Sequence, residues 1–439
     1  MPGRGGLRKM RVATREITST PDVSKIKNPI TQTLAFALAA RVLAADALQW
    51  HLWRQGDGRL CLFPDTTIYW QLAQAIHDRA IYQIVEWNDI PHFALRAPGY
   101  PLFIALCMSL MGQSTLAVRL AQALLGAACA PLVFALAQAT IQSQPNSTRA
   151  TTPPAAAWIV AIHPYAILGS VILLSEALFT PLMLLVLWGL AVVWEERSGW
   201  RVIAIATGLI AGCAILTRPS WGLFPPLAVV GMVLARGFSR RSLASAGLIV
   251  LGIVLAMAPW WGRNYQVFGR FVPTALWMGA SLHDGLNPAA TGSSDMSFMA
   301  RDDVWPLDEE DQDQMLSRQA VSYAWSHPGR VVELAAIKLG LYWLPWPRVS
   351  GGRGLLAMVV GGLVEVPLMA LMAMGLWIRR RDPRTWVLLA GPILYFCLVH
   401  LVFASSMRYR LPSEPAAWVL AAVGLGRIWR PEGGSEPQG

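Results

Sequence analysis

Long apolar runs that carry almost no charge constrain this chain more than any other feature of its sequence. A membrane-spanning helix needs about 20 consecutive apolar residues, because the hydrocarbon core of a bilayer is about 30 Å thick. Such runs occur in residues 30–50, 115–140, 154–170, 172–194, 201–217, 219–235, 243–261, 354–378, 384–405 and 412–429. We therefore predict an all-α polytopic membrane protein with about 10 transmembrane helices. Hydrophobic residues make up 54% of the chain and charged residues only 14%, which excludes an ordinary soluble protein.

The positions of basic clusters predict which loops face the cytoplasm, since cytoplasmic loops carry an excess of arginine and lysine. If the spans alternate, clusters precede the first span and follow the fourth, sixth, eighth and tenth, all on one side. Their residues are Arg8, Lys9, Arg11, Arg15, Arg197, Arg201, Arg236, Arg240, Arg241, Arg379, Arg380, Arg381, Arg384, Arg427 and Arg430. Both termini are then cytoplasmic, and loop 262–353 faces outside. The net charge of +10 follows from this orientation and does not indicate nucleic-acid binding.

Three further segments are predicted to lie along the outer membrane surface. Residues 96–112, RAPGYPLFIALCMSLMG, form an apolar run that is too short to cross, and counting it as a span would place four basic clusters outside. In residues 66–84, apolar side chains recur at helical spacing on one face. Residues 329–346 end in tryptophan and proline, and tryptophan favours the headgroup level. We predict interfacial helices in these segments, two in the first outer loop and one in the fourth.

The spans divide the chain into a core, a long outer loop, three C-terminal spans and two cytoplasmic tails. The seven-span core is residues 29–262 with outer loop 51–114, the long outer loop is 263–353, the C-terminal spans are 354–430, and the tails are 1–28, basic and predicted to be disordered, and 431–439. The five cysteines are odd in number and lack CxxC spacing. Neither a disulfide framework nor a zinc site is therefore predicted.

Five arginines fall at the outer edge of apolar segments, where the positive-inside tendency does not place them. They are Arg96, Arg218, Arg263, Arg408 and Arg410. Charges at this depth are costly and suggest a function, although each side chain alone could instead snorkel to lipid headgroups. A guanidinium group binds phosphate through two parallel charge-assisted hydrogen bonds. The set as a whole favours a site for a phosphate anion on the outer side.

Arg96 precedes Pro98, Gly99 and Tyr100 at the start of a predicted surface helix. Proline suits the first helical turn, and unpaired backbone N–H groups at a helix start bind anions. Glycine would also allow a ligand to approach the backbone closely. The alternative is a tight, proline-shaped entry into a helix without a ligand. Arg96 and Tyr100 are therefore candidates for contacts to the phosphate or the substrate.

Two carboxylates on the outer side are candidate functional groups. Asp65 precedes the first predicted surface helix, where it is either an N-cap or a catalytic base, and Tyr69 shares its face one turn later. Glu176 lies near the outer end of the fourth span. There it either pairs with an arginine, such as Arg41 or Arg218, or faces a polar cavity.

Other chemistry-bearing patterns offer no alternative site. Asp311-Gln312-Asp313 superficially resembles the DxD motif with which nucleotide-sugar transferases hold a metal, but it starts a polar helix and further acids flank it. We interpret this stretch as a solvated helical face. None of the seven histidines has a metal-ligand spacing, and the sequence contains no glycine-rich phosphate loop or GxSxG motif.

Seven short motifs stand in order along residues 30–425 and on one side of the predicted membrane. They are Asp65 with Tyr69 and Ala73; Arg96-Ala97-Pro98-Gly99-Tyr100-Pro101; Ser175-Glu176; Thr217-Arg218-Pro219; Pro259-Trp260-Trp261-Gly262-Arg263-Asn264-Tyr265; Phe268-Gly269 with Phe271-Val272-Pro273; and Arg408-Tyr409-Arg410-Leu411-Pro412. Together they resemble the GT-C superfamily of membrane glycosyltransferases. The most similar group is bacterial and family 39-like, related to dolichyl-phosphate-mannose protein mannosyltransferases and to the aminoarabinose transferase of lipid A.

The resemblance implies a fold of seven core spans, two interfacial helices in the first outer loop and a third after the seventh span. It implies that Asp65 is the catalytic base, that Arg96 contacts the donor phosphate and that Glu176 lines the site. It also implies a polyprenyl-monophosphate sugar as donor, with no metal or other cofactor required. The family's usual RPPGYP reads RAPGYP here. Some members carry a soluble C-terminal domain that binds the acceptor, and none is predicted here, so the acceptor stays open.

The residues and the resemblance together predict an inverting glycosyltransferase with its site on the periplasmic side of a bacterial inner membrane. The bacterial assignment follows a composition rich in alanine and arginine but poor in lysine. Asp65 is the general base for a glycan, lipid or protein acceptor, and the five outer arginines with Tyr69, Tyr100 and Glu176 surround the donor. The alternative is a flippase or transporter for a lipid-linked sugar, which would need its binding residues nearer the bilayer midplane.

Overall fold

The computed structural model describes residues 23–56, 63–85, 89–141, 146–196, 198–348 and 354–429. Most of the predicted N-terminal tail and all of the C-terminal tail, 431–439, lie outside these residues. Residues 23–28, which we predicted as part of the tail, are helical and begin the first helix, α1 (Val23–Arg54).

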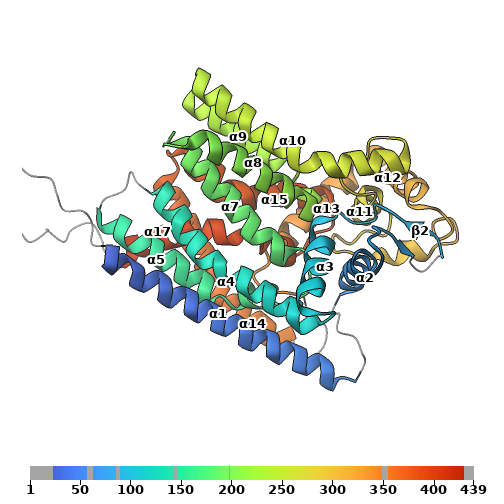
Figure 1. Ribbon diagram of the computed structural model, residues 1–439, viewed down its shortest axis with the longest axis horizontal. Coiled ribbons are helices and arrows are strands. Elements are labelled where there is room, and N and C mark those ends of the chain that lie inside the picture. Colours follow the sequence, from blue (N-terminus) through green and yellow to red (C-terminus); the bar gives the residue numbers. More distant parts are fainter. Residues whose placement is uncertain are drawn as a thin grey trace, which may run out of the picture.

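Among the described residues, seven helices are long and apolar enough to cross a membrane (Figure 1). They are α1, α4 (Thr115–Thr140), α7 (Glu176–Trp194), α8 (Trp200–Thr217), α10 (Arg240–Phe268), α14 (Gly354–Arg379) and the helix Thr385–Val402, which consists of the π-helical η3 (Thr385–Ala390) and α15 (Gly391–Val402). Large apolar side chains such as Leu355 and Leu363 are exposed on the outside of α14. Since exposed leucine is favourable in lipid, the prediction of an all-α polytopic membrane protein is confirmed.

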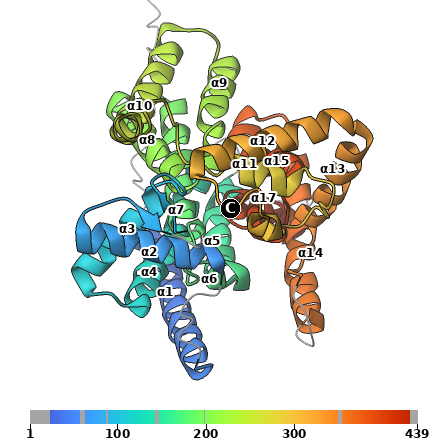
Figure 2. The same ribbon diagram turned by 90° about the vertical axis from the view of Figure 1, so that its right-hand side faces the viewer.

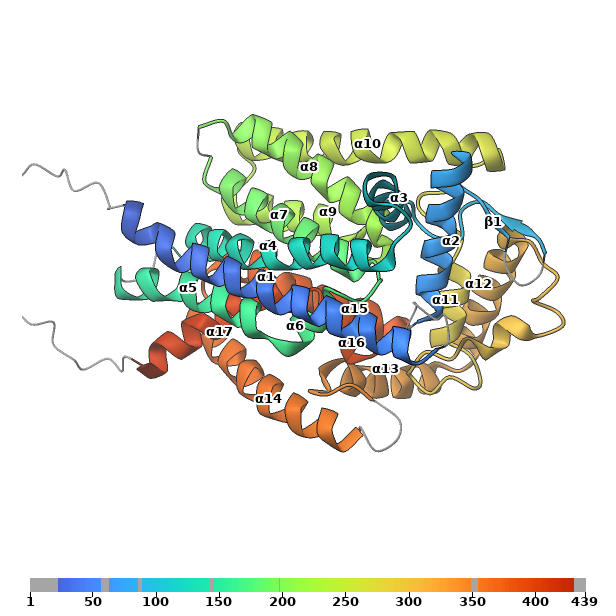
Figure 3. The ribbon, with the colours of Figure 1, turned by 60° about the horizontal axis from the view of Figure 1, so that its bottom comes forward.

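The other three predicted spans are shorter helices in the same bundle (Figure 3). They are α5 (Asn146–Ile162), α9 (Phe224–Arg236) and α17 (Glu414–Trp429). The predicted span 154–170 is interrupted at His163, because Pro164 starts a separate short helix, α6 (Pro164–Gly169). Pro219 likewise opens a 3-10 turn, η1 (Pro219–Trp221), ahead of α9. The apolar runs therefore overstate the length of a helix where proline interrupts them.

Glycine allows α8 and α10 to pack closely. A Cβ added at Gly208 of α8 would lie 2.1 Å from the carbonyl oxygen of Ile249, and one at Gly252 of α10 would lie 2.4 Å from that of Ile205. Both distances are far below van der Waals contact, so neither position admits a side chain without a shift of the backbone. Small residues have this role at helix interfaces in membranes, where lipid is as apolar as leucine. The main apolar core lies between α4, α5, α7, α15 and α17.

Shorter elements gather at one end of the bundle, which we call the α2–α3 end (Figure 2). They are α2 (Pro64–Arg79), α3 (Gly99–Met111), α11 (Met278–Gly285), η2 (Met296–Ala300), α12 (Glu309–Ser326), α13 (Pro328–Trp343) and the antiparallel strands β1 (Ile84–Val85) and β2 (Pro91–His92). Helices α2, α3 and α13 fall in the three segments predicted to hold interfacial helices. Helix α11 was not predicted.

The segments that carry the predicted site residues meet at this end. Asp65 is in the first turn of α2, Arg96 precedes α3, Glu176 begins α7 and Arg218 ends α8. Arg408 lies on α16 (Met407–Arg410), a single turn between α15 and α17 that packs against α13 and α15. The fold therefore brings residues from five distant parts of the sequence to one place.

Candidate functional site

Five charged side chains from these segments form one continuous chain of ion pairs, which we call the open ion chain. Arg96 Nη2 lies 3.0 Å from Asp65 Oδ1, and Arg408 Nη2 lies 3.6 Å from Asp65 Oδ2. Arg408 Nε donates to Glu176 Oε1 at 2.8 Å, and Arg218 Nη1 lies 3.1 Å from the same oxygen. Three guanidinium groups and two carboxylates give the chain a net charge of +1. It can therefore accept one further negative charge.

The open ion chain is accessible at two of its five members, Asp65 and Arg408, which are neighbours in it. The side chains of Asp65 and Arg408 are 39% and 31% exposed, whereas Arg96, Glu176 and Arg218 are buried. Buried ion pairs hold their geometry, while exposed pairs exchange partners with water at little cost. A ligand can therefore reach Asp65 and Arg408 without opening the rest of the chain.

Asp65 does not cap its helix. The N-cap of α2 is Phe63, and Pro64 occupies the first helical position. The sequence left open whether Asp65 is an N-cap or a catalytic base. The N-cap role is excluded, because Phe63 takes that position. The Asp65 carboxylate is instead held by Arg96 and Arg408.

Arg96 is fixed by stacking and by the packing of α3. Its guanidinium group lies 3.9 Å above the ring of Trp277 and donates to the carbonyl oxygen of Leu95 at 3.2 Å. A Cβ added at Gly99 would lie 2.6 Å from Thr217 Oγ1. Gly99 therefore allows α3 to approach the end of α8, next to Arg218, while the ligand contact at its backbone stays a prediction.

Glu176 pairs with two arginines. Arg218 is one of the two partners that the sequence suggested, and Arg408 is the other contact. Arg41, the second suggested partner, instead donates to the carbonyl oxygens of Ala37, Val160 and Ala161. Ser175 also donates to the second oxygen of Glu176 at 3.3 Å.

Tyr69 and Tyr100 lie beside the open ion chain. Their rings meet edge to face with centroids 4.9 Å apart, and the Tyr100 hydroxyl accepts a hydrogen bond from Gln122 at 3.1 Å. Burial, with the nearby Asp65 carboxylate, raises the pKa of Tyr69. Tyr69 therefore remains a neutral hydroxyl at physiological pH.

Aromatic faces behind the guanidinium groups were missed from the sequence. Besides Trp277 behind Arg96, the ring of Phe63 lies 5.2 Å from the Arg408 guanidinium, and Tyr409 lies 5.7 Å from that of Arg218. Such stacking orients a guanidinium without neutralising it. Phe63 and Tyr409 adjoin predicted residues in sequence, which is a usable signal, but nothing in the sequence relates Trp277 to Arg96.

Arg263 is not a member of the open ion chain and lies one step behind Arg96. Its Nη2 donates to the carbonyl oxygen of Tyr82 at 2.8 Å, and its Nη1 donates to Asn264 at 3.0 Å. The Tyr82 hydroxyl in turn donates to the carbonyl oxygen of Arg96 at 2.9 Å. Arg263 therefore holds Tyr82, and Tyr82 in turn holds the backbone of Arg96.

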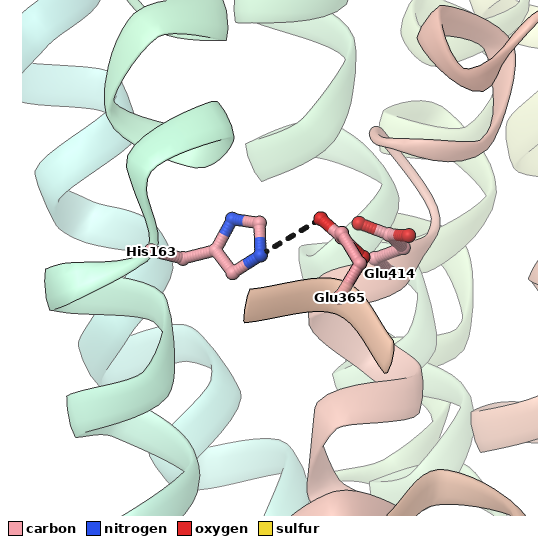
Figure 4. A group of neighbouring side chains, drawn as sticks. All are labelled: His163, Glu365 and Glu414. Atoms are coloured by element: carbon pink, nitrogen blue, oxygen red, sulfur yellow. Dashed lines mark ion pairs between the residues drawn. The ribbon is translucent and has the colours of Figure 1, made fainter. Parts of the chain in front are cut away.

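Arg410 lies apart, in what we call the buried cluster with His163, Glu365 and Glu414. Figure 4 shows the other three side chains of this cluster. All four side chains are buried, and Arg410 is 0% exposed. Arg410 Nε donates to Glu414 Oε1, and its Nη2 lies 3.4 Å from Glu365 Oε2. Its Nη1 donates to the carbonyl oxygens of Tyr342 and Leu344. The structure thus does not bring Arg410 to Asp65 and Arg96.

The buried cluster is the one group among the described residues with metal-ligand spacing. His163, Glu365 and Glu414 each offer an atom within 4.8 Å of the others. However, His163 Nδ1 accepts the N–H of Ala166, so the ring proton sits on Nε2, which is the atom a metal would need. That nitrogen lies 3.0 Å from Glu365 Oε1. Arg410 already supplies a cation to both carboxylates, so the arrangement suits an ion-pair network better than a metal.

Comparisons with known proteins support the resemblance. Residues 95–261 match the family model of dolichyl-phosphate-mannose-protein mannosyltransferases, and no curated protein matches significantly in sequence. The apo oligosaccharyltransferase of Archaeoglobus fulgidus superposes with a TM-score of 0.54 at 12% identity, covering 91% of this chain and 50% of that one. The same protein, AglB, with an inhibitory peptide and a dolichol-phosphate gives 0.53 at 12% identity, covering 92% and 51%. ArnT from Cupriavidus metallidurans bound to undecaprenyl phosphate gives only 0.44 at 15% identity, covering 91% and 78%.

At these identities the similarity to the oligosaccharyltransferase shows the fold alone, and the chain spans about half the length of those structures. The matched family segment, residues 95–261, contains Arg96, Glu176 and Arg218. Asp65 and Arg408 lie on either side of it. The family resemblance predicted from the short motifs is confirmed.

Proposed function

The chain is a membrane protein of the GT-C glycosyltransferase fold, and on this premise we propose that it transfers a sugar from a polyprenyl-monophosphate donor to an acceptor. The observation that carries the proposal is the open ion chain. Its accessible part presents a carboxylate, Asp65, between the guanidinium groups of Arg96 and Arg408. A base and an anion site that share one surface are what this reaction needs.

The donor phosphate binds between Arg96 and Arg408 in this proposal. Each guanidinium group can hold a phosphate through two parallel hydrogen bonds. A sugar phosphodiester carries one negative charge, which neutralises the net +1 charge of the chain. The phosphate replaces Asp65 as the partner of both arginines, and the released carboxylate is then free to accept a proton.

The chemical step is a direct displacement at the anomeric carbon. The acceptor oxygen or nitrogen attacks from the side opposite the phosphate, so the configuration inverts, and Asp65 takes the acceptor's proton. The bond between the anomeric carbon and the phosphate oxygen breaks, and its electron pair stays on the phosphate. Arg96 and Arg408 stabilise this growing charge, so no general acid is required.

The remaining residues hold the reacting groups in place. Glu176 anchors Arg408 and is itself held by Arg218. Tyr69 lies near Asp65, and the buried Tyr100 packs edge to face against Tyr69. Arg410 is enclosed by its own partners, so we do not assign it to the donor site.

Two further observations support a lipid-linked donor at the outer surface of the membrane. A structure with this fold, that of AglB, contains a dolichol-phosphate. The basic residues Arg201, Arg240 and Arg427 lie at the helix ends opposite the α2–α3 end, which orients the open ion chain away from the cytoplasm.

A transfer assay tests the proposal. Purified protein in lipid nanodiscs is supplied with radiolabelled polyprenyl-monophosphate sugars and with envelope glycans, lipids and proteins as acceptors. We expect label to move from lipid to acceptor with at least one donor. Absence of transfer with every donor would contradict the proposal. Movement of the donor across vesicles without transfer would establish the flippase alternative, although the charged residues gather at one end of the bundle and not near its middle.

A further inference from the structure

We infer that Glu309, on the long outer loop, is a positioning residue that holds Arg96 toward Asp65 by clamping the backbone two residues ahead of it. The inference rests on the proposed function only for its effect on donor use. Glu309 Oε1 accepts the N–H of Phe93 at 2.7 Å, and Oε2 accepts that of Ala94 at 3.0 Å. The residue is only 3% exposed.

The outer loop binds this segment at further points besides Glu309. The carbonyl oxygen of Ala94 accepts the N–H of Leu276 at 2.7 Å. The next residue, Trp277, lies under the Arg96 guanidinium. Ala94 therefore has both of its backbone polar groups bound to the loop, and Arg96 has its side chain stacked on the same loop.

Helices α11 and α12 form a firm base for Glu309. Gly279 donates to Asp313 Oδ1 at 2.6 Å, and a Cβ at Gly279 would lie 2.0 Å from the carbonyl oxygen of Asp313. The two helices therefore pack backbone against backbone. The stretch Asp311-Gln312-Asp313, which we interpreted as a solvated face, is exposed at Asp311, but Gln312 is buried and the expectation was wrong there. Glu309, one of the acids that flank this stretch, also turns inward, with Leu316 and Ala320.

Only the ionised form of Glu309 can accept with both oxygens, because a protonated carboxyl presents a donor on one of them. The protonated form is left with one oxygen for both N–H groups, since Oε1 lies 2.7 Å from the nitrogen of Phe93 and 3.1 Å from that of Ala94. Burial raises the pKa of Glu309 to about 7, against the two N–H groups and Arg263, which favour the carboxylate. The other groups that face it are Glu310 and His92, whose Nδ1 lies 4.0 Å from Oε2 and whose pKa burial lowers. His92 therefore adds no charge near pH 7, and the clamp loosens as the pH falls through about 7.

Clamping and stability respond to this ionisation in opposite directions. The pKa of Glu309 in the folded protein lies above the ordinary glutamate value of about 4.3, so ionisation between these values lowers the free energy of unfolding as pH rises. Yet the ionised form is the one that holds the segment. Glu309→Gln removes the buried charge and one acceptor, so it should weaken the clamp without lowering the melting temperature at pH 8.

The test combines hydrogen exchange with donor kinetics in the full-length protein at pH 8. In E309Q we expect faster amide exchange in residues 92–96 and a rise of about tenfold in the donor KM, from the loss of a hydrogen bond to a charged group. The fall of donor kcat/KM below pH 7 that we expect in the wild type should disappear. E310Q, which changes the neighbouring half-exposed glutamate, should leave the exchange and the KM unchanged at pH 8. Because the Glu310 charge raises the pKa of Glu309, E310Q should keep the fall of kcat/KM but move it to lower pH.

The inference would be overturned if E309Q kept the exchange, the KM and the pH profile of the wild type. It would also be overturned if E309Q and E310Q changed equally. A lower melting temperature with an unchanged KM would reduce Glu309 to a structural residue. If the wild type transfers no sugar, the proposed function fails, and hydrogen exchange alone still decides the clamp. If E309Q does not fold, the wild type must show faster exchange of 92–96 at pH 6 than at pH 8, after correction for intrinsic rates.

Discussion

Helix α16 is a single turn, yet its two arginines belong to opposite kinds of site. Arg408 is 31% exposed and joins the open ion chain, while Arg410 is fully enclosed in the buried cluster. Two residues along a helix differ by about 200° in direction, so neighbours of this spacing face opposite ways. This single turn therefore places the cation of Arg408 at the surface and that of Arg410 in the interior.

The two groups differ in charge balance as well as in exposure. The open ion chain has three arginines and two carboxylates, so a cation is in excess and an anion can be added. The buried cluster has two carboxylates for one arginine, with His163 placed to donate from Nε2. Fixed charges that are enclosed and fully used hold a fold together, whereas an accessible group with excess charge is suited to a ligand.

Removing Arg410 should give the largest effect, because it leaves two carboxylates buried without a cation. We expect Arg410→Met to cost about 3–5 kcal/mol, enough to prevent recovery of folded protein. The triple variant with Glu365→Gln and Glu414→Gln should recover much of the loss. Yield from size-exclusion chromatography and the melting temperature measure both effects. A stable, active R410M would erase the distinction between the two groups.

Replacing Asp65 tests the open ion chain, where we expect a loss of activity and not of folding. Asp65→Asn keeps the shape but removes the base, so kcat should fall by about 10²–10⁴-fold. Donor binding should persist or tighten, because the carboxylate no longer competes with the phosphate for Arg96 and Arg408. Asp78→Asn, a change farther along the same helix, is the matched control. Wild-type turnover by D65N would exclude its assignment as base.

Removing Arg408 should weaken donor use and spare the fold. Glu176 keeps Arg218, and Asp65 keeps Arg96, so Arg408→Ala leaves each of the two carboxylates a partner. We expect kcat/KM for the donor to fall by about 10–100-fold, the effect of losing a charge-assisted hydrogen bond to phosphate. Arg408→Lys should recover only part, because lysine cannot bind bidentately. The control is Arg270→Ala at the same end, and equal losses in both variants would count against a specific phosphate contact.

The sequence predicted the helices of the bundle, because long apolar runs and the positions of basic residues are enough to locate them. Apolar runs located all ten bundle helices, and the positions of basic residues placed 96–112 outside the set of crossings. Boundaries failed at Pro164 and Pro219, where an apolar run continues through a break in the helix. Helix α11 has the sequence MGASLHDG, too short to show a period, so its existence depends on packing against α12.

The sequence predicted site residues by one criterion, which is that a charged residue falls on the outer side of the predicted membrane. That criterion brought Asp65, Arg96, Glu176, Arg218 and Arg408 together. It could not separate Arg408 from Arg410, because both lie on the same side and differ only in helical direction. Nor could it find Trp277, which stacks on Arg96, or Glu309, which binds the backbone of Phe93 and Ala94. Both lie about 200 residues from Arg96 in the sequence and reach this segment through tertiary packing.

The smallest expected effect sharpens the contrast between the groups. In the buried cluster the inward oxygens of Glu365 and Glu414 face one N–H donor, that of His163, so one oxygen is left without a proton to accept. Glu414→Gln supplies an amide N–H there and still accepts from Arg410, while the fixed charge of the cluster rises from −1 to zero. We expect the free energy of unfolding to change by less than about 1 kcal/mol, or to increase. The matched change in the open ion chain, Glu176→Gln, should lower donor kcat/KM, because Arg408 loses the charge that anchors it. Chemical denaturation and donor kinetics measured on both variants decide the point, and a strongly destabilised E414Q would mean that both buried carboxylates are needed in the ionised form.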